Sequence, residues 1–329
     1  MTASGEYAEG VPCWIDASLP DVQAGKRFYG ALFGWTFDDG ADKEHGYYTQ
    51  AYTGEGVDRA CVAALAAKAD GRMPTAWGVY LATPDAAALV RRARKAGGQI
   101  VTDAVQVGPY GTMAQIADPG GAVFGVWQAD SHPGFDKKAA PGCFCWTEAH
   151  VRAEDKERVD AFYDAVFGFG TYDLPEESGA DFRVWSPAGT EPGDETAVGG
   201  RAVISRDLPA ELPAHYLSYF LVEDCDEAVA KVQRLGGRVG QPPFDTPYGR
   251  MAVVVDDQGA VFAVMAEPEP EPEAGVGAGR EEAEAGAGAD REEAEAASGA
   301  GREQAGAAWG ARPAEGEGAA RAVPEEGKP

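Results

Sequence analysis

The sequence is poor in basic residues, cysteine and histidine, and it has no long apolar run. Its 329 residues carry 28 Lys and Arg against 54 Asp and Glu, a formal net charge of −26. Because phosphates and anionic lipids are bound by clustered basic side chains, this balance argues against nucleic acid and membrane partners. No apolar stretch approaches the roughly 20 residues that span a bilayer. The segment Met1-Thr2-Ala3-Ser4-Gly5-Glu6 lacks a secretory pattern, so we expect a cytoplasmic protein.

The five cysteines do not form a disulfide or zinc-binding pattern. Their number is odd, and none of them belongs to a CxxC pair of the zinc type. In a reducing compartment such residues are usually buried thiols. We therefore expect free cysteines at Cys13, Cys61, Cys143, Cys145 and Cys225.

The last 63 residues, 267–329, differ in composition from the rest of the chain. They hold 16 acidic and 6 basic side chains among Ala, Gly and Pro, and Trp309 is their only aromatic residue. Since they have little to bury, they cannot offset the entropy cost of ordering. We expect a disordered acidic tail. The alternative is an interaction segment that becomes helical and docks Trp309 on a partner.

The remainder of the sequence repeats itself. Cys13-Trp14-Ile15-Asp16 returns as Cys145-Trp146-Thr147-Glu148, and Phe28-Tyr29 to Trp35 returns as Phe162-Tyr163 to Phe169. Pro109-Tyr110-Gly111 and the hairpin that begins at Asp118 return 138 residues later, at Pro247-Tyr248-Gly249 and Asp256. Repeats in conserved order indicate homologous units. The sequence thus predicts two domains, 10–129 and 141–266, joined by a linker, 130–140.

Each predicted domain reads as two similar halves. In the first half a short strand precedes an amphipathic segment, 21–33, with apolar Val22, Phe28 and Leu32. The expected elements are strands at 13–19, 35–37, 47–52 and 60–66 around that helix, and then a strand at 77–82, a helix at 85–96 and strands at 99–101, 112–118 and 123–128. The same order fits 144–204 and 216–265. We predict an α+β fold of four βαβββ modules.

These features resemble the vicinal oxygen chelate superfamily, which includes glyoxalase I, extradiol dioxygenases, fosfomycin-resistance enzymes and bleomycin-binding proteins. The resemblance rests on the paired modules, the helix ending in FYxxxFGW or FYxxxFGF, and the hairpins DPGGAVF and DDQGAVF. It covers about residues 10–266 and is strongest to tandem-domain glyoxalase-like proteins of actinobacteria. It implies two glyoxalase/bleomycin-resistance-type domains, each with a cup for a small ligand.

The resemblance also implies a divalent metal in those members that are enzymes, held by His on a first strand and Glu on a last strand. Such an ion binds two adjacent substrate oxygens and stabilises an enolate or a peroxo species. Here the corresponding positions carry residues without ligating side chains: Trp14, Gly78 and Gly125 in the first domain, and Leu217 and Ala263 in the second. We therefore expect the first domain to work without a metal ion.

The second domain keeps more potential ligands. Strand alternation places Trp146, Glu148 and His150 on one face, and His215 begins a strand that also carries Tyr219. Glu148, His150 and His215 form a two-His, one-carboxylate set suited to a divalent ion such as Fe, Mn, Zn or Ni. The competing interpretation is that Glu148 hydrogen-bonds the backbone and His215 is solvated.

Aromatic residues at repeated positions favour ligand binding. Rings provide contact area and stacking for planar organic molecules at low entropy cost. The competing interpretation is that most of these rings belong to the core, as we expect for Phe28, Tyr29, Phe162 and Tyr163. The candidate ligand-binding residues are Trp14, Asp16, Trp77, Tyr80, Tyr110, Trp146, Tyr219 and Tyr248.

The sequence therefore favours a small-molecule-binding protein, either a monomer or a homodimer. The first alternative is a metal-dependent lyase, isomerase or oxygenase whose site lies in the second domain, with Glu148 and Tyr219 as catalytic candidates. The second alternative is an interaction protein that works through its acidic tail. The sequence does not name the ligand or the reaction.

Overall fold

A computed structural model describes residues 7–38, 48–175, 180–205 and 208–268. The predicted disordered tail and the alternative role of Trp309 lie outside the described residues, apart from the first two tail positions.

The first domain contains the predicted order of elements twice. Its strand β6 is longer than predicted because it is an edge strand with mostly exposed residues, which gives it little hydrophobic pattern. The elements are β1 (Pro12–Leu19), α1 (Val22–Phe33), β2 (Thr36–Phe37), β3 (Thr49–Thr53), β4 (Ala60–Ala67), β5 (Ala76–Ala82), α2 (Ala86–Lys95), β6 (Gln99–Val107), β7 (Gly111–Ala117) and β8 (Val123–Ala129).

The second domain repeats this order. Its elements are β9 (Phe144–Val151), α3 (Lys156–Phe167), β10 (Gly170–Asp173), β11 (Phe182–Ser186), β12 (Gly199–Val203), β13 (His215–Leu221), α4 (Cys225–Arg234), β14 (Arg238–Thr246), β15 (Gly249–Val255) and β16 (Val261–Ala266). The α+β class and the four βαβββ modules are thereby confirmed. The proposed boundaries of the domains, the linker and the tail remain predictions.

Each domain forms one eight-stranded sheet. The strand orders are β2-β3-β4-β1-β5-β8-β7-β6 and β10-β11-β12-β9-β13-β16-β15-β14. The two modules of a domain meet where β1 pairs antiparallel with β5, and where β9 pairs antiparallel with β13. Modules therefore pair within each half of the chain.

The helices begin and end where local chemistry satisfies their free backbone groups. The Asp21 carboxylate accepts hydrogen bonds from the backbone N–H groups of Gln23 and Ala24 at the start of α1. Gly34 ends α1 in the left-handed region at φ 73°, and Gly168 ends α3 at φ 64°. The repeated FG sequence thus sets the end of both helices.

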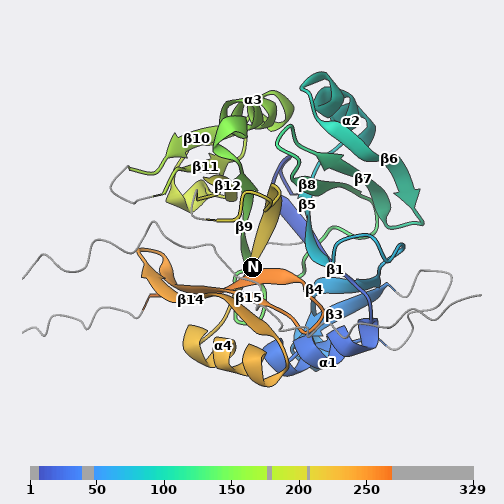
Figure 1. Cartoon of the computed structure of the whole chain (residues 1–329). Coiled ribbons are helices and arrows are strands. Elements are labelled where there is room, and N and C mark those ends of the chain that lie inside the picture. Colours follow the sequence, from blue (N-terminus) through green and yellow to red (C-terminus); the bar gives the residue numbers. More distant parts are fainter. Residues whose placement is uncertain (1–6, 39–47, 176–179, 206–207, 269–329) are drawn as a thin grey trace, which may run out of the picture.

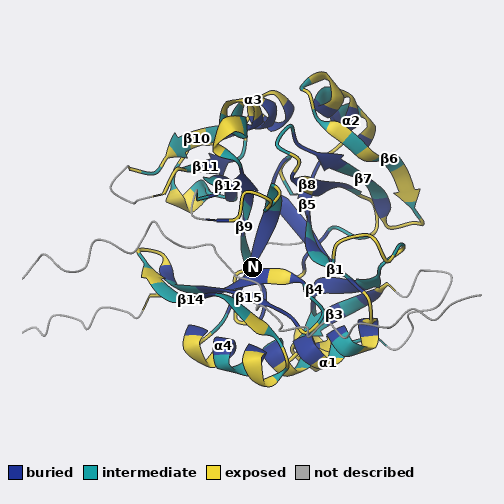
Figure 2. Cartoon of the chain, viewed as in Figure 1, coloured by how far each residue is buried: buried dark blue, intermediate teal, exposed yellow. Residues whose placement is uncertain are grey.

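The two sheets pack against each other through their helix-covered faces and form one continuous core. Figure 1 shows α2 beside α3 and α1 beside α4, with the central strands between the two helix pairs. Phe33 of α1 stacks on Phe220 of β13, with ring centroids 4.9 Å apart. In Figure 2 the central strands are dark blue, whereas the outer surfaces of the helices are yellow.

Two equivalent buried tyrosines join the domains. The Tyr29 hydroxyl on α1 donates to Asp256 Oδ2 in the last hairpin at 2.8 Å and accepts from Trp77 Nε1 at 3.0 Å. The Tyr163 hydroxyl on α3 donates to Asp118 Oδ2 at 3.1 Å. The expected core role of these helix tyrosines is confirmed, since Tyr29 is 0% and Tyr163 1% exposed.

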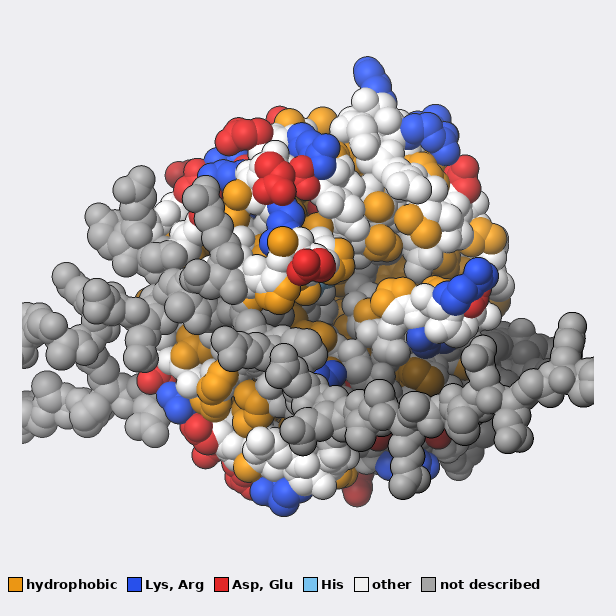
Figure 3. All heavy atoms as spheres, viewed as in Figure 1, with side chains coloured by type: hydrophobic (Ala, Val, Ile, Leu, Met, Phe, Trp, Pro, Cys, Tyr) orange, Lys and Arg blue, Asp and Glu red, His pale blue; other side chains and the backbone are white. Residues whose placement is uncertain are grey.

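The cysteines are free thiols, and the surface carries charged side chains of both signs (Figure 3). All five cysteines are free, and four of them are buried. Figure 3 shows basic and acidic side chains interspersed with apolar atoms on the visible face. Within the described part of the chain, no helix is long and apolar enough to cross a membrane.

Candidate functional site

The candidate site lies on the face of each sheet that carries no helix. Side chains alternate along a strand, so Ile15 and Ala17 of β1 point into the core while Trp14 and Asp16 point to the opposite face. We define the first cup by residues of the first sheet and the second cup by residues of the second. They are Trp14, Asp16, Tyr48, Tyr80 and Trp127 for the first cup, and Trp146, Glu148, His150, His215 and Tyr219 for the second.

In the first cup, a tryptophan and two tyrosines converge on the Asp16 carboxyl group. The Tyr80 hydroxyl donates to Asp16 Oδ2 at 3.0 Å, and the Tyr48 hydroxyl donates to the same oxygen at 3.3 Å. Trp14 Nε1 in turn donates to the Tyr48 hydroxyl at 2.7 Å. Asp16 Oδ1 faces Gly78, whose missing side chain leaves space for it. Both hydrogen bonds from tyrosines therefore fall on a single oxygen of Asp16.

The surroundings of Asp16 favour its protonated form. Burial raises the pKa of Asp16 from 3.8 to about 6, although the hydrogen bonds from Tyr80 and Tyr48 act in the opposite direction. Asp16 and Tyr80 are each 9% exposed and Trp14 is 4% exposed. The carboxyl group of the first cup is thus buried, and it can exchange a proton near neutral pH.

The second cup repeats this arrangement with a longer acid. The Tyr219 hydroxyl donates to Glu148 Oε2 at 3.0 Å, as Tyr80 does to Asp16. Trp146 Nε1 donates directly to Glu148 Oε1 at 3.1 Å. Because Glu148 has one more methylene group than Asp16, it reaches its tryptophan without a bridging tyrosine.

The predicted metal-ligand candidates lie together on β9 and β13. His150 Nε2 lies 3.0 Å from Glu148 Oε2, and His215 pairs with His150 across the two strands. The two imidazole rings are stacked, with centroids 5.1 Å apart and an angle of 8° between their planes. Burial and the neighbouring His150 lower the pKa of His215 to about 4. The proposed proximity of the three residues is therefore present in the structure.

Neither cup fits the metal centre that the family resemblance implies. In the first, a Cβ on Gly125 would lie 2.3 Å from the Tyr80 ring, so no longer side chain fits there. In the second, an imidazole binds a metal in its own plane, and the nearly parallel rings of His150 and His215 do not converge on one point. Among the residues that the structure describes, no group of three His, Cys, Asp or Glu side chains is arranged to hold a metal ion.

Three other predicted ligand-binding residues lie away from the cups. Trp77 is buried at the domain interface, where its indole N–H binds Tyr29. Tyr110 and Tyr248 are 46% and 48% exposed in the turns that precede β7 and β15. Trp14, Asp16, Tyr80, Trp146 and Tyr219 are the predicted residues that the structure brings into the two cups.

Sequence reasoning missed Tyr48, Trp127 and His132, which also contribute to the first cup. Trp127 Nε1 donates to the backbone oxygen of His132 at 2.8 Å. The His132 ring stands edge-on to Trp14, with centroids 4.5 Å apart. His132 belongs to the predicted linker. The Gly, Pro and Lys residues of that segment are typical of a connection between domains, so they gave no sign that His132 lies in the site. The equivalent of Trp127 in the second domain is Met265, so the repeat gave no signal for it either.

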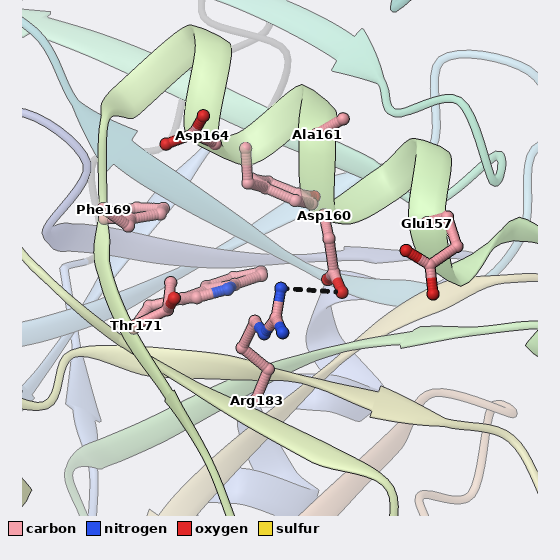
Figure 4. A pocket seen from close by; sticks show the side chains of 9 residues that line it. Glu157, Asp160, Ala161, Asp164, Phe169, Thr171 and Arg183 are labelled. Atoms are coloured by element: carbon pink, nitrogen blue, oxygen red, sulfur yellow. Dashed lines mark ion pairs between the residues drawn. The ribbon is translucent and has the colours of Figure 1, made fainter.

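A separate groove of about 300 Å³ lies under α3, on the helix-covered face of the second sheet. Figure 4 shows Asp160 and Arg183 facing each other across it; their ion pair measures 3.1 Å. Arg183 also pairs with Asp173 at 2.7 Å. Because Arg183, the basic side chain of the groove, is already paired with two carboxylates, we assign the candidate site to the cups.

Comparisons with known proteins agree with the repeat in the chain. The family model described as Glyoxalase/Bleomycin resistance protein/Dioxygenase superfamily matches residues 14–126 and again 147–264. The chain is 35% identical over 268 residues to CFP32 of Mycobacterium tuberculosis, a protein named provisionally as a glyoxylase; the match covers 80% of this chain and 98% of CFP32. It is 34% identical over 283 residues to the anthracycline biosynthesis protein DnrV of Streptomyces peucetius, covering 83% and 98%.

A solved structure shares the fold at low sequence identity. The Mn(II)-bound glyoxalase from Novosphingobium aromaticivorans aligns with a TM-score of 0.51 and 16% identity, covering 80% of this chain and 84% of that one. At this identity the match shows the architecture alone.

Proposed function

Since this chain belongs to the glyoxalase/bleomycin resistance protein/dioxygenase superfamily, we propose that it binds a small planar organic molecule in its cups, without a metal ion in the first. The observation that carries the proposal is the repeated set of Trp, carboxyl group and Tyr. Trp14, Asp16 and Tyr80 recur as Trp146, Glu148 and Tyr219, with the tyrosine hydrogen-bonded to the acid in both cups.

This set suits an aromatic ligand that carries oxygen atoms. Indole and phenol rings offer flat apolar contact area, and the carboxyl group offers a hydrogen bond of fixed direction. In the first cup both tyrosines donate to Asp16 Oδ2, which leaves Oδ1, the oxygen that faces Gly78, as the atom that would meet the ligand. A protonated Asp16 donates a hydrogen bond to a carbonyl or phenol oxygen, and an ionised one accepts from a hydroxyl group.

The curated relatives suggest the chemical class of the ligand. Two of them are named anthracycline biosynthesis proteins, and anthracyclines are planar, oxygen-rich polycyclic compounds. We propose that the ligand of this chain belongs to the same chemical class, which is planar polycyclic aromatic compounds with hydroxyl or carbonyl groups. Because Trp14 is 4% exposed, entry to the first cup requires the side chains around it to move, and we expect slow association there.

A second candidate function is a metal-dependent lyase, isomerase or oxygenase reaction in the second cup. The proximity of Glu148, His150 and His215 favours it, because all three are potential metal ligands on the neighbouring strands β9 and β13. Tyr219 would then orient the substrate through the hydroxyl group that it now gives to Glu148. The stacking of His150 on His215 is the observation against a metal ion at this position.

Isothermal titration with 2,6-dihydroxyanthraquinone and with 2-naphthol tests the binding proposal. Neither compound holds a metal ion between adjacent oxygens, so a bound metal would not account for affinity. We expect dissociation constants below about 100 μM, which correspond to about 5.5 kcal/mol. The double variant Asp16→Ala/Glu148→Ala should lose binding, whereas Asp103→Ala, on the exposed strand β6, should keep it. Absence of binding at millimolar concentration, or equal binding by the double variant, would refute the proposal.

A further inference from the structure

The predicted linker, 130–140, contributes ordered residues to the first cup. Before His132, the N–H groups of Asp130 and His132 donate to the Tyr110 backbone oxygen at 2.9 and 3.1 Å. After it, Phe135 N donates to the Cys13 backbone oxygen at 2.9 Å, and Asp136 N donates to that of Cys61, also at 2.9 Å. We define residues 130–136 as the strap. It crosses one end of the first sheet, from the turn before β7 to the starts of β1 and β4.

The sequence of the strap fits this path. Gly134 has φ 122°, a conformation that favours glycine, and a Cβ there would lie 2.3 Å from the Cys13 backbone oxygen. Phe135 is 6% exposed and stacks on Phe144 with centroids 5.2 Å apart. These contacts fix the strap on both sides of His132, so the position of the imidazole is determined by the fold.

The His132 ring lies between two tryptophans of the first cup. It stands edge-on to Trp14, at 4.5 Å, and 6.0 Å from Trp127 between ring centroids. Its Nε2 atom is buried and has no hydrogen-bond partner among the described residues. A buried polar atom without a partner costs free energy and needs an explanation, and a ligand that supplies the missing hydrogen bond is one.

We propose that His132 is a specificity residue of the first cup, whose Nε2 atom hydrogen-bonds a hydroxyl group on an aromatic ligand held against Trp14. This inference rests on the proposed binding function. It adds that the first cup selects ligands that carry a hydroxyl group. Burial lowers the pKa of His132, which favours the neutral imidazole, although the nearby Asp136 acts in the opposite direction. A neutral ring accepts a hydrogen bond from a phenol at its unprotonated nitrogen.

Among the residues that the structure describes, the second cup has no counterpart of the strap histidine. At the repeat distance of 138 residues the sequence has Pro270 where the first domain has His132, and Pro270 lies outside the described residues. Met265 replaces Trp127 in the second sheet. We therefore assign selection for a hydroxyl group at this point to the first cup.

The test compares 2-naphthol with 2-methylnaphthalene, two probes of almost equal shape that differ in a hydroxyl group. Binding is measured by titration of the full chain carrying Glu148→Ala, which leaves the first cup intact. In His132→Phe, which keeps a ring beside Trp14, we expect about tenfold weaker binding of 2-naphthol and less than twofold change for 2-methylnaphthalene. His132→Gln keeps a hydrogen-bonding group and should retain most of the preference for 2-naphthol.

Phe135→Leu is the matched control, because Phe135 also contacts Trp14 but has no polar side-chain atom. It should weaken both probes equally. Equal losses for both probes in His132→Phe would show that His132 has only a structural role and would overturn the inference. Unchanged binding of 2-naphthol would also overturn it, because this result is expected if Nε2 meets only a water molecule. If His132→Phe does not fold, the test uses His132→Gln. A folded His132→Gln variant that no longer prefers 2-naphthol to 2-methylnaphthalene would likewise overturn the inference. Failure of the parent to bind either probe would instead refute the binding function itself.

Discussion

The Tyr80 ring occupies the space that a side chain at position 125 would need. A Cβ on Gly125 would lie 2.3 Å from Tyr80 Cδ1, and the hydroxyl group of the same tyrosine donates to Asp16 at 3.0 Å. The position at which the family resemblance implies a metal-binding glutamate is thus filled from the neighbouring strand. The same tyrosine thus both fills this space and hydrogen-bonds the acid of the first cup.

Restoring a carboxylate at this position should therefore harm the protein. We expect Gly125→Glu to displace Tyr80 and to lower the free energy of unfolding by about 1–3 kcal/mol, because it overfills a packed site. Urea denaturation measures the change. Gly71→Glu is the control, since a Cβ on Gly71 meets no atom within 4 Å. A Gly125→Glu protein of unchanged stability that binds a divalent ion would contradict this account.

Asp16 should make stability depend on pH. Its pKa in the folded protein, about 6, lies above the ordinary 3.8, so the folded state holds a proton that the unfolded state releases between these values. The resulting stabilisation is complete below pH 4 and is lost as the pH rises through 6. Removing the charge with Asp16→Asn should therefore raise the free energy of unfolding at pH 8 by up to about 3 kcal/mol, and much less at pH 4.

The measurement for Asp16→Asn is urea denaturation of both proteins at pH 4, 6 and 8, with the difference between them taken at each pH. Asp103→Asn, which removes a carboxylate from the exposed strand β6, serves as the matched control. An Asp16→Asn variant that is less stable than the parent at pH 8 would show that Asp16 is stabilising as an anion.

The buried tyrosines between the domains should be sensitive to loss of their hydroxyl groups. Tyr29→Phe leaves both Asp256 Oδ2 and Trp77 Nε1 without this partner, and we expect a loss of about 2–3 kcal/mol in the free energy of unfolding. Thermal and urea unfolding measure it. Tyr110→Phe, in an exposed turn, should change stability by less than about 0.5 kcal/mol. Similar values for the two variants would mean that the interface does not depend on this hydrogen bond.

Metal content separates binding from metal-dependent chemistry. We expect protein purified without chelators to contain far less than one Fe, Mn, Zn or Ni ion per chain by elemental analysis, because the rings of His150 and His215 are stacked. Near-stoichiometric metal that disappears in the double variant His150→Ala/His215→Ala would overturn this expectation and favour the enzyme in the second cup. The single variant His132→Ala should not alter metal content and serves as control.

The fold could be predicted because the sequence is duplicated. Hairpins at Asp118 and Asp256 and helices ending at Gly34 and Gly168 mark the modules, and strand alternation placed Trp14 with Asp16 on one face. The strap could not be predicted in this way. It is held mainly by backbone hydrogen bonds and by a left-handed glycine, which have no periodic pattern in sequence. Likewise Trp77 shares the repeated position of Tyr216, but only packing shows that both lie at the interface.

The hydrogen bond from Tyr29 to Asp256 joins residues 227 positions apart. A growing polypeptide emerges with the first domain well ahead of the hairpin that carries this aspartate. Domains usually fold in the order of their synthesis, but here the first one cannot complete its buried contacts until translation has nearly reached the end of the second. Until the hairpin is made, the Tyr29 hydroxyl lacks its Asp256 partner, so completion of the first domain depends on synthesis of the second.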